Sequence, residues 1–269
     1  MSKNEYLNKK TKNDKNLKTE GKGDSIMKEK ENEEEIITYN IIVGKIKIKI
    51  NNLKQRIINS YENFKANNHD EIKGVENEKE IKACEIFIND EKIDFTYFYK
   101  FPKKGEYIIK YIFKNLLNST NYMFSDCDSL ISLDLSNFNT QNITNMTGMF
   151  NYCNSLISLN LTNFNTQNIT NMAGLFFNCN SLKSLDLSNF NTEKVTKMDY
   201  MFSYCNSLIS LDLSNFNIKK VTKMNYMFSY CNSLTLLDLP NFDIQNVNKE
   251  NIFNKCNSLI INLSIKDLI

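Results

Sequence analysis

The C-terminal half of the chain repeats one pattern of hydrophobic and polar positions every 26 residues. In the copy at residues 180–205, Leu182, Leu185 and Leu187 follow the spacing L-x-x-L-x-L, and the last two alternate with polar residues. Alternation with a period of two is typical of a β-strand with one buried face and one wet face. The first half of each repeat is therefore predicted to be a short strand.

The second half of the same repeat has a different period. Met198, Met201, Phe202 and Cys205 lie at positions i, i+3, i+4 and i+7, which would place all four side chains on one face of an α-helix. Thr196 comes just before this pattern and is a residue type that favours the N-cap of a helix. The pattern therefore predicts one short helix in every repeat.

One strand and one short helix cannot bury their apolar faces alone, but stacked copies form a continuous core. Two apolar columns occupy equivalent positions of the copies: Leu133, Leu159, Leu185, Leu211 and Leu237, and Phe138, Phe164, Phe190, Phe216 and Phe242. Strands of adjacent turns lie about 4.8 Å apart, whereas packed helices need about 8–10 Å. We therefore predict an α/β solenoid, with a strand and a short helix per turn, that curves with its sheet on the concave side.

The run N-S-L-x-S-L-D-L-S-N-F-N-T-x-x-V-T-x-M-x-x-M-F-x-x-C resembles the 26-residue repeat of the BspA-like leucine-rich-repeat surface proteins. The resemblance covers about 140 of the 269 residues and recurs around five times. It implies a leucine-rich-repeat solenoid. Because proteins of that family are mostly surface-exposed and serve adhesion or host interaction, it also implies a binding role.

The segment 36–117 has a different character and is predicted to be a small β-rich (α+β) domain. Isoleucines and lysines alternate over residues 45–50, as expected of a strand with one wet face, and Ser60 is a suitable N-cap for a short helix. Three β-rich stretches follow and are predicted to form an antiparallel meander. They cover residues 85–90, 92–101 and 106–114.

Both ends of the repeat array show how it is closed. Residues 116–127 align with only the second half of a repeat and follow directly on the last β-rich stretch, so 36–117 is predicted to cap the solenoid formed by 118–269. The C-terminal stretch 261–269 is a predicted closing strand. Residues 1–35 are mostly Lys, Glu, Asn and Asp and are predicted to be a disordered charged tail.

Composition excludes several classes of function. The chain has 33 Lys and Arg against 31 Asp and Glu, and a formal net charge of +2, so no global field attracts nucleic acid. It has one His, no phosphate-binding loop and no C-x-x-C pair, and we predict no catalytic residue, cofactor or metal site. No apolar run reaches the roughly 20 residues of a spanning helix, so membrane insertion is not expected.

The cysteines recur with the repeat and do not indicate a disulfide framework. Their number, seven, is odd, and from Cys127 to Cys231 they recur every 26 residues. The cysteines from Cys127 onward lie on the apolar stripe of the second half of a repeat, whereas Cys84 lies in the preceding domain. They are therefore predicted to be free, buried thiols that act as small hydrophobic groups.

Candidate ligand-binding residues lie on the polar side of the predicted strands. They form a serine column and an acidic column on what we predict to be a concave face: Ser132, Ser158, Ser184 and Ser210, and Asp134, Asn160, Asp186, Asp212 and Asp238. Solenoids commonly bind on such a face, although the same residues would also serve to keep a sheet soluble. A second candidate contact surface lies off the apolar stripe. It consists of Tyr200, Tyr204, Tyr226 and Tyr230 with Lys197 and Lys223.

These observations favour a monomeric, non-enzymatic module that binds a protein partner. The alternatives are an exported surface adhesin of the BspA-like type and, less favoured, an enzyme subunit with its site in 36–117.

A cytoplasmic location is expected from the charged leader, the absence of an anchor and the odd cysteine set, with the cell surface, reached by an unconventional route, as the alternative. Sequons at tightly packed positions also argue against a glycosylating pathway. They begin at Asn118, Asn142, Asn145, Asn160, Asn168 and Asn262.

Overall fold

The computed structural model describes residues 40–67, 75–239 and 247–259. All of these residues belong to one compact unit. The predicted tail at 1–35, Phe242 of the phenylalanine column and the predicted closing strand at 261–269 lie outside the described residues.

The described part of the chain is a mixed α/β structure in which strands dominate. Its two helices are short and lie before the repeats: α1 (Tyr61–Asn67) and α2 (Glu78–Lys82). The strands are β1 (Asn40–Ile48), β2 (Leu53–Arg56), β3 (Glu85–Ile88), β4 (Glu91–Ile93), β5 (Phe98–Phe101), β6 (Gly105–Phe113), β7 (Leu130–Asn137), β8 (Ser158–Asn160), β9 (Ser210–Asp212) and β10 (Leu236–Asp238).

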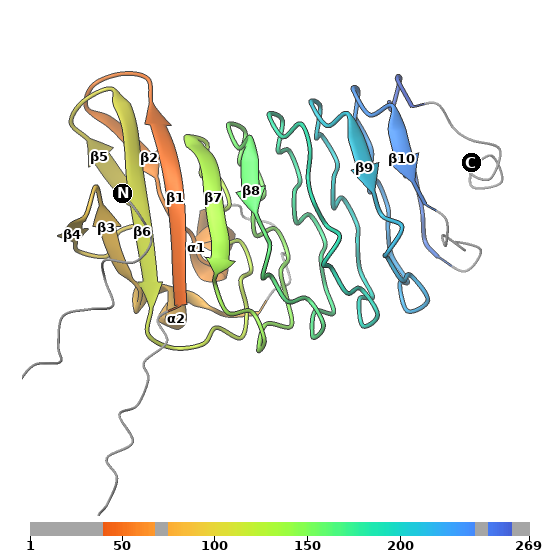
Figure 1. Ribbon diagram of the computed structural model, residues 1–269, viewed down its shortest axis with the longest axis horizontal. Coiled ribbons are helices and arrows are strands. Elements are labelled where there is room, and N and C mark those ends of the chain that lie inside the picture. Colours follow the sequence, from red (N-terminus) through yellow and green to blue (C-terminus); the bar gives the residue numbers. More distant parts are fainter. Residues whose placement is uncertain (1–39, 68–74, 240–246, 260–269) are drawn as a thin grey trace, which may run out of the picture. The chain divides into compact units, whose positions relative to one another are not determined.

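The main sheet joins the first part of the chain to the repeats. Its order is β4-β3-β6-β1-β7-β8, with β1 antiparallel to both β6 and β7, and β7 parallel to β8 (Figure 1). The predicted alternation is confirmed over residues 46–48, since Ile46 and Ile48 are buried and Lys47 is exposed, but it is wrong at Ile50, which lies beyond the end of β1 and is 60% exposed. Residues 40–117 therefore supply the strand that covers the first strand of the array.

The predicted meander is wrong in its order. Strand β3 pairs with β4 and with β6, whereas β5 leaves this sheet and pairs with β2 in a separate two-stranded ribbon. The middle stretch breaks after β4, which is only three residues long, and β5 contacts the main sheet through its side chains, with the rings of Phe101 and of Tyr107 in β6 4.8 Å apart. Tyr99 and Phe101 stack edge to face at 4.9 Å, and Phe101 is fully buried.

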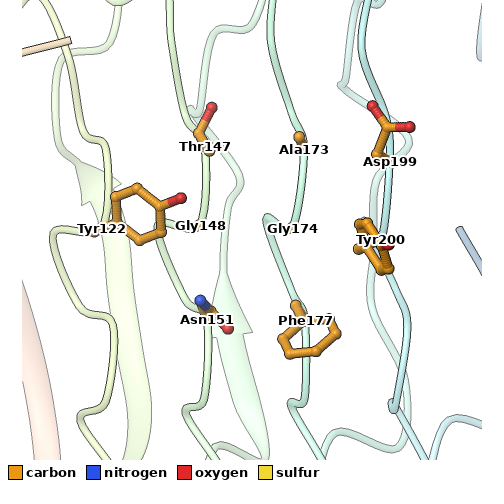
Figure 2. A pocket seen from close by; sticks show the side chains of 9 residues that line it. All are labelled: Tyr122, Thr147, Gly148, Asn151, Ala173, Gly174, Phe177, Asp199 and Tyr200. Carbon is orange, nitrogen blue, oxygen red and sulfur yellow. The ribbon is translucent and has the colours of Figure 1, made fainter. Parts of the chain in front are cut away.

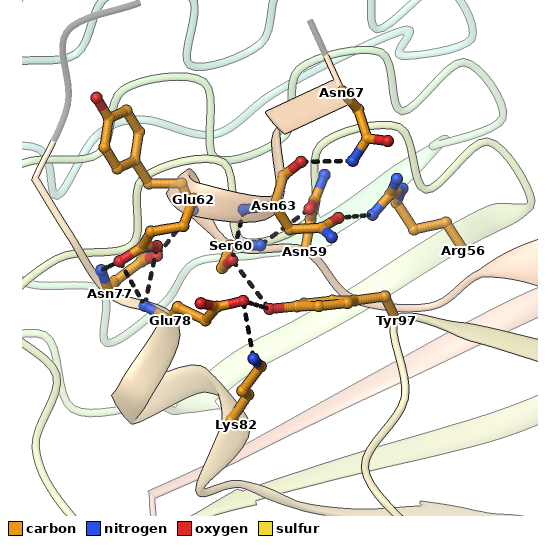
Figure 3. Close-up of polar contacts among 11 residues, drawn as sticks. Arg56, Asn59, Ser60, Glu62, Asn63, Asn67, Asn77, Glu78, Lys82 and Tyr97 are labelled. Carbon is orange, nitrogen blue, oxygen red and sulfur yellow. Dashed lines mark hydrogen bonds and ion pairs between the residues drawn. The ribbon is translucent and has the colours of Figure 1, made fainter. Parts of the chain in front are cut away.

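Polar side chains fasten the two helices to each other. Ser60 is the N-cap of α1, as predicted, since its Oγ accepts the N–H of Asn63 at 3.1 Å. The carboxylate of Glu62 accepts the N–H groups of Asn77 and Glu78 and so caps α2 from the neighbouring helix (Figure 3). Tyr97 joins this network by donating to Glu78 at 2.6 Å.

The repeats stack one turn on the next along their strands. Strands β7 and β8 pair in parallel with Leu133 beside Leu159, and β9 and β10 pair with Leu211 beside Leu237. Each pair joins residues 26 apart, which is the sequence repeat. The predicted leucine column is therefore confirmed as a column of the core, with Leu159 and Leu185 half-buried and the other members buried.

The predicted helix in the second half of each repeat is wrong. Residues 198–205 form a succession of turns in which Tyr200 and Tyr204 have φ of 56° and 61°. Alternate N–H groups bond within the turn, as from Met201 to the carbonyl of Met198, and the others bond the next repeat, as from Tyr200 to Asn225. Thr196 is not a helix cap, because its hydroxyl donates to the carbonyl of Thr170 in the preceding repeat.

The turns imitate helical spacing because their own period is four residues. A left-handed residue recurs at Tyr200 and Tyr204, and buried side chains recur with it at Met198, Phe202 and their neighbours. Four is close to the 3.6 residues of a helical turn, so eight residues of sequence do not separate the two structures. What separates them is the adjacent repeat, which offers carbonyls to the N–H groups that a helix would use internally.

Both sides of each repeat are therefore held by backbone bonding between turns. Isolated parallel bridges join Asn145 to Asn171, Asn171 to Lys197, and Lys197 to Lys223, opposite the strand ladder. Phenylalanine rings on this side stack at the same close spacing, with centroids 5.5–5.7 Å apart along the run from Phe150 to Phe228. The curvature was predicted because a helical side would be wider than the strand side. Since the two sides have similar spacing, this premise is wrong, and no concave face follows from it.

A buried threonine ladder links the loops between the two halves. Thr192 is 1% exposed, and its hydroxyl donates to the carbonyl of Asn217 at 3.1 Å and accepts the N–H of Asn217 at 2.7 Å. Thr140 and Thr166 make the same pair of bonds to the next repeat. One hydroxyl thus satisfies two backbone groups of the adjacent turn.

Replacing Thr192 with Val should destabilise the protein by about 2 kcal/mol although the two side chains have nearly the same volume, because both backbone groups of Asn217 lose their partner. Thr192→Ser is the matched control. It keeps the hydroxyl and should cost only the lost methyl group, about 0.8 kcal/mol. Urea unfolding followed by circular dichroism measures both, and equal costs for the two variants would contradict the role of the hydroxyl.

Residues 118–269 alone should aggregate, because β7 loses its partner β1, and Met123 and Phe124, which are fully buried, become exposed. Residues 38–269, the whole compact unit, should remain monomeric. Size-exclusion chromatography with light scattering compares the two. A monomeric and equally stable 118–269 fragment would show that 40–117 does not protect the array.

Candidate functional site

The predicted ligand residues line the outer side of the strand ladder, which we call the strand face. Asp134, Asn160, Asp186, Asp212 and Asp238 are all exposed. The serines Ser158, Ser184 and Ser210 are also exposed, while Ser132 is half-buried. The strand pairing places Ser132 beside Ser158, Asp134 beside Asn160, and Asp212 beside Asp238. The structure thus brings the two columns together as predicted, and whether they bind a ligand stays a prediction.

The acidic column also has a structural role that the sequence pattern does not reveal. Asp134, Asp186 and Asp212 each accept the backbone N–H of the residue two positions on, at 2.8–3.0 Å, and so close the turn at the end of the strand segment. Asn160 does the same and donates to Asp134 at 2.9 Å. This bond relieves the repulsion expected from carboxylates on neighbouring strands.

Hydrogen bonds hold the carboxylates of Asp186 and Asp212 in the charged form. The hydroxyl and then the backbone N–H of Ser188 lower the pKa of Asp186. For Asp212 the backbone N–H of Ser214 comes first and its hydroxyl second, and the pKa is again lowered. Both side chains are therefore fixed negative charges on the strand face at neutral pH.

Exposed aliphatic side chains lie in or next to the serine column, and sequence reasoning missed them. Ile157 is 54% exposed, Ile209 52% and Leu236 61%. Leu236 pairs with Ser210 on the neighbouring strand, and thus occupies the serine column. Leu236 was visible in the sequence as an apolar residue at a polar position of the period-two pattern, whereas Ile157 and Ile209 occupy the first variable position of L-x-x-L-x-L.

The second predicted surface is an aromatic one that stacks from turn to turn. The rings of Tyr200 and Tyr226 stack at 5.0 Å, and those of Tyr204 and Tyr230 at 4.4 Å. All four tyrosines have positive φ, which turns their side chains outward from the apolar core. Phe177 contacts both columns edge to face, with ring centroids 6.0 Å from Tyr200 and 5.6 Å from Tyr204.

A cavity of about 270 Å³ interrupts this aromatic surface (Figure 2). The positions equivalent to Tyr200 in the two preceding repeats are Gly174 and Gly148, while the repeat before them has Tyr122. Figure 2 shows the two glycines between Tyr122 on one side and Tyr200 on the other. Side chains of Asn151, Phe177 and Asp199 complete much of the lining.

Two polar groups of this cavity are hydrogen-bond acceptors. Oδ1 of Asn151 is buried and has no hydrogen-bond partner, and the residue as a whole is 8% exposed. Asp199 accepts the N–H and the side-chain amide of Asn225 through one oxygen, at 3.1 and 2.8 Å. Within the described ranges Asp199 has no ion-pair partner.

The seven cysteines are free in the structure, and all but Cys256 are buried. The thiol of Cys205 donates to the carbonyl of Phe176 in the preceding repeat at 3.1 Å, and Cys153, Cys179 and Cys231 make the equivalent bond. Burial raises the pKa of Cys205 to about 12, so it is a protonated thiol.

Metal ligands, membrane-spanning helices and unengaged carboxylates are the remaining features that bear on function in the part of the chain that the structure describes. No group of three or more His, Cys, Asp and Glu side chains there could hold a metal ion. Neither α1 nor α2 has the length and apolar character needed to span a lipid bilayer. In the predicted capping segment, the carboxylates of Glu62 and Glu78 are engaged by backbone N–H groups, Tyr97 and Lys82.

Asparagine side chains form a further ladder that sequence reasoning missed. Asn154 donates to Asp128, Asn180 to Asn154, Asn206 to Asn180 and Asn232 to Asn206, at 2.7–2.9 Å for the first three and 3.0 Å for the last. The available signal was the recurring first residue of the N-S-L run, which is Asn in every later copy and Asp at position 128. Its repetition reflects bonding between turns rather than ligand binding.

A family model described as "Mycoplasma protein of unknown function, DUF285" matches the chain at residues 105–159, 118–235 and 153–266. The three matches overlap and together run from 105 to 266, which is more than half of the 269 residues. No curated protein and no solved structure matches the chain.

Replacing Asp186 with Asn should test the structural role of the acidic column. The amide can still accept from Ser188, so the variant should lose only the charge-dependent part, roughly 0.5 kcal/mol or less at this exposed site. Because the folded-state pKa of Asp186 is lowered, this difference is present above the ordinary Asp pKa of about 3.9 and disappears as the pH falls through the lowered value. Thermal unfolding of both proteins from pH 7 to pH 2 measures it, and a difference that grows on acidification would contradict it.

Proposed function

The chain belongs to the DUF285 family, and we propose that it is a non-enzymatic module that binds a protein partner on its strand face. The observation that carries the proposal is the exposure of Ile157, Ile209 and Leu236 beside a column of fixed carboxylates. Exposed aliphatic side chains on an ordered, repeated surface are typical of interaction sites. A rim of charges around them gives such a site its selectivity.

The chemistry of the strand face selects the kind of partner. Aliphatic side chains at Ile209 and Leu236 need an apolar surface to cover them, and Asp186 and Asp212 favour Lys or Arg at its edge. The partner that fits is therefore a protein with an apolar patch surrounded by basic residues.

We extend the proposal to the architecture, which we take to be a divergent leucine-rich-repeat solenoid of the BspA-like type. Support comes from the L-x-x-L-x-L leucines, which form a core column, and from one parallel strand segment in the repeats that contain β7, β8, β9 and β10. The turns at residues 198–205 take the place of the helix expected in each repeat. A binding role on the strand side is common to such solenoids.

A non-enzymatic role is supported by the use of the polar groups in the first part of the chain. Glu62 caps α2, and Glu78 bonds Tyr97 and Lys82 (Figure 3). The pKa of Glu78 is lowered, first by the Tyr97 hydroxyl and then by Lys82, as expected of a carboxylate in a structural network. These groups fasten helices and leave no general base in this cluster.

Ile209→Ser with Leu236→Ser should weaken binding of the partner at least tenfold, about 1.4 kcal/mol, because the apolar contact is lost. The full chain is immobilised, partners are captured from native lysate, and the affinity of each identified partner is measured by biolayer interferometry. A second variant, Asp186→Asn with Asp212→Asn, removes charge while keeping the turns and should weaken binding mainly at low salt.

Val75→Ser is the matched control, because Val75 is an aliphatic residue of similar exposure, 43%, outside the strand face. It should bind as the wild type does. Partners that bind both strand-face variants as tightly as wild type would overturn the proposal. Circular dichroism confirms that each variant is folded.

A further inference from the structure

The gap in the tyrosine column is a second binding site with its own chemistry. We propose that the cavity between Tyr122 and Tyr200 binds the guanidinium group of an arginine side chain presented by a protein partner. It lies among the turns of residues 122–200 and not on the strand face, so the proposal does not rest on the function proposed above.

Backbone conformation alone does not account for the two glycines. Gly148 and Gly174 have φ of 59° and 61°, but Tyr122, Tyr200 and Tyr226 occupy equivalent positions with the same left-handed φ of 56°. A tyrosine is therefore compatible with this backbone. What the glycines provide is the space that a side chain would fill.

The space is used differently at the two glycines. The ring of Tyr122 lies over Gly148, where it would collide with an added Cβ. Tyr122 is held in this place by Phe64 of α1, whose ring stacks on it at 3.9 Å. At Gly174 an added Cβ would meet only the Cβ of Phe177, at 3.7 Å, so the space beside Gly174 is open. The cavity is therefore bounded by packed residues and not by a loose loop.

The polar groups of the cavity call for a ligand that donates hydrogen bonds. Oδ1 of Asn151 is a buried acceptor without a partner, which costs folding free energy unless a ligand supplies a donor. The hydroxyl of Thr147 already donates to Asn145, at 2.6 Å, and so can offer only acceptor capacity. Asp199 adds a negative charge, and none of the nine lining residues is cationic.

The aromatic walls of the cavity favour a planar ligand. Aromatic rings of Tyr122, Phe177 and Tyr200 line the cavity, and Tyr200 is 43% exposed at its edge (Figure 2). Guanidinium is planar, stacks on aromatic rings, carries a positive charge and has five N–H donors. It satisfies the acceptors, the carboxylate and the rings together. A tyrosine ring would supply one donor and no charge, and a lysine ammonium would supply no plane.

The test uses the full chain labelled with ¹⁵N-glycine, which gives at most seven signals because the chain has 7 glycines. N-acetyl-arginine methylamide is titrated, with the corresponding lysine, citrulline and tyrosine derivatives and free L-arginine as separate arms. The signals of Gly148 and Gly174 should shift saturably with the arginine derivative, at least tenfold more tightly than with lysine, citrulline or tyrosine. The signal of Gly105, the first residue of β6, should not move.

Variants assign the binding to the cavity. Gly174→Tyr should restore the stacked column, keep or raise the melting temperature, and abolish the shift of Gly148. Asp199→Asn keeps an oxygen for the amides of Asn225 but removes the charge, and should weaken binding at least fivefold. Should Gly174→Tyr fail to fold, Asp199→Asn alone decides the assignment.

Three results would overturn the proposal. The first is the absence of a saturable shift with the arginine derivative. The second is equal or tighter binding of the lysine, citrulline or tyrosine derivative. The third is tighter binding of free L-arginine than of the blocked derivative, which would make the cavity an amino-acid site and not a protein-docking one. None of these results depends on the strand face, which the Ile209 and Leu236 variants test separately.

Discussion

Backbone hydrogen bonding between successive turns is the interaction on which the rest of this structure depends. It operates on the strand side, as between Leu133 and Leu159, and on the opposite side, as between Tyr200 and Asn225. Because both sides use backbone bonds, equivalent side chains of adjacent turns are held at strand spacing everywhere. Columns of like residues follow from this, whether they stack in the core as phenylalanines or on the surface as tyrosines.

The same bonding also explains why the turns tolerate an unfavourable backbone conformation. A tyrosine at positive φ is unfavourable by about 1–2 kcal/mol, yet Tyr200, Tyr204, Tyr226 and Tyr230 all adopt it. The conformation directs alternate N–H groups to the next turn, and ring stacking recovers a further part of the cost. Where glycine replaces tyrosine, the backbone continues unchanged and only the ring is lost, so a surface cavity opens without loss of the ladder.

The candidate sites differ in how much of each could be predicted from the sequence. The serine and acidic columns are visible as a period-two pattern, and the structure places them together. Their bonds to the following turn are not visible, because they depend on how the chain leaves the strand at Asp186 and Asp212. The cavity beside Gly174 was not predicted, since its walls come from four successive turns and one wall depends on Phe64 holding the ring of Tyr122 in place.

Sequence by itself determined the 26-residue register, the leucine and phenylalanine columns, the strand alternation at residues 46–48 and the N-cap at Ser60, because each depends on local spacing or on identity between repeats. Tertiary structure alone decided that residues 198–205 form turns and not a helix, and that β5 pairs with β2. The physical reason is the same in both cases. A backbone N–H bonds the carbonyl that lies closest in space, and which carbonyl that is depends on neighbours distant in sequence.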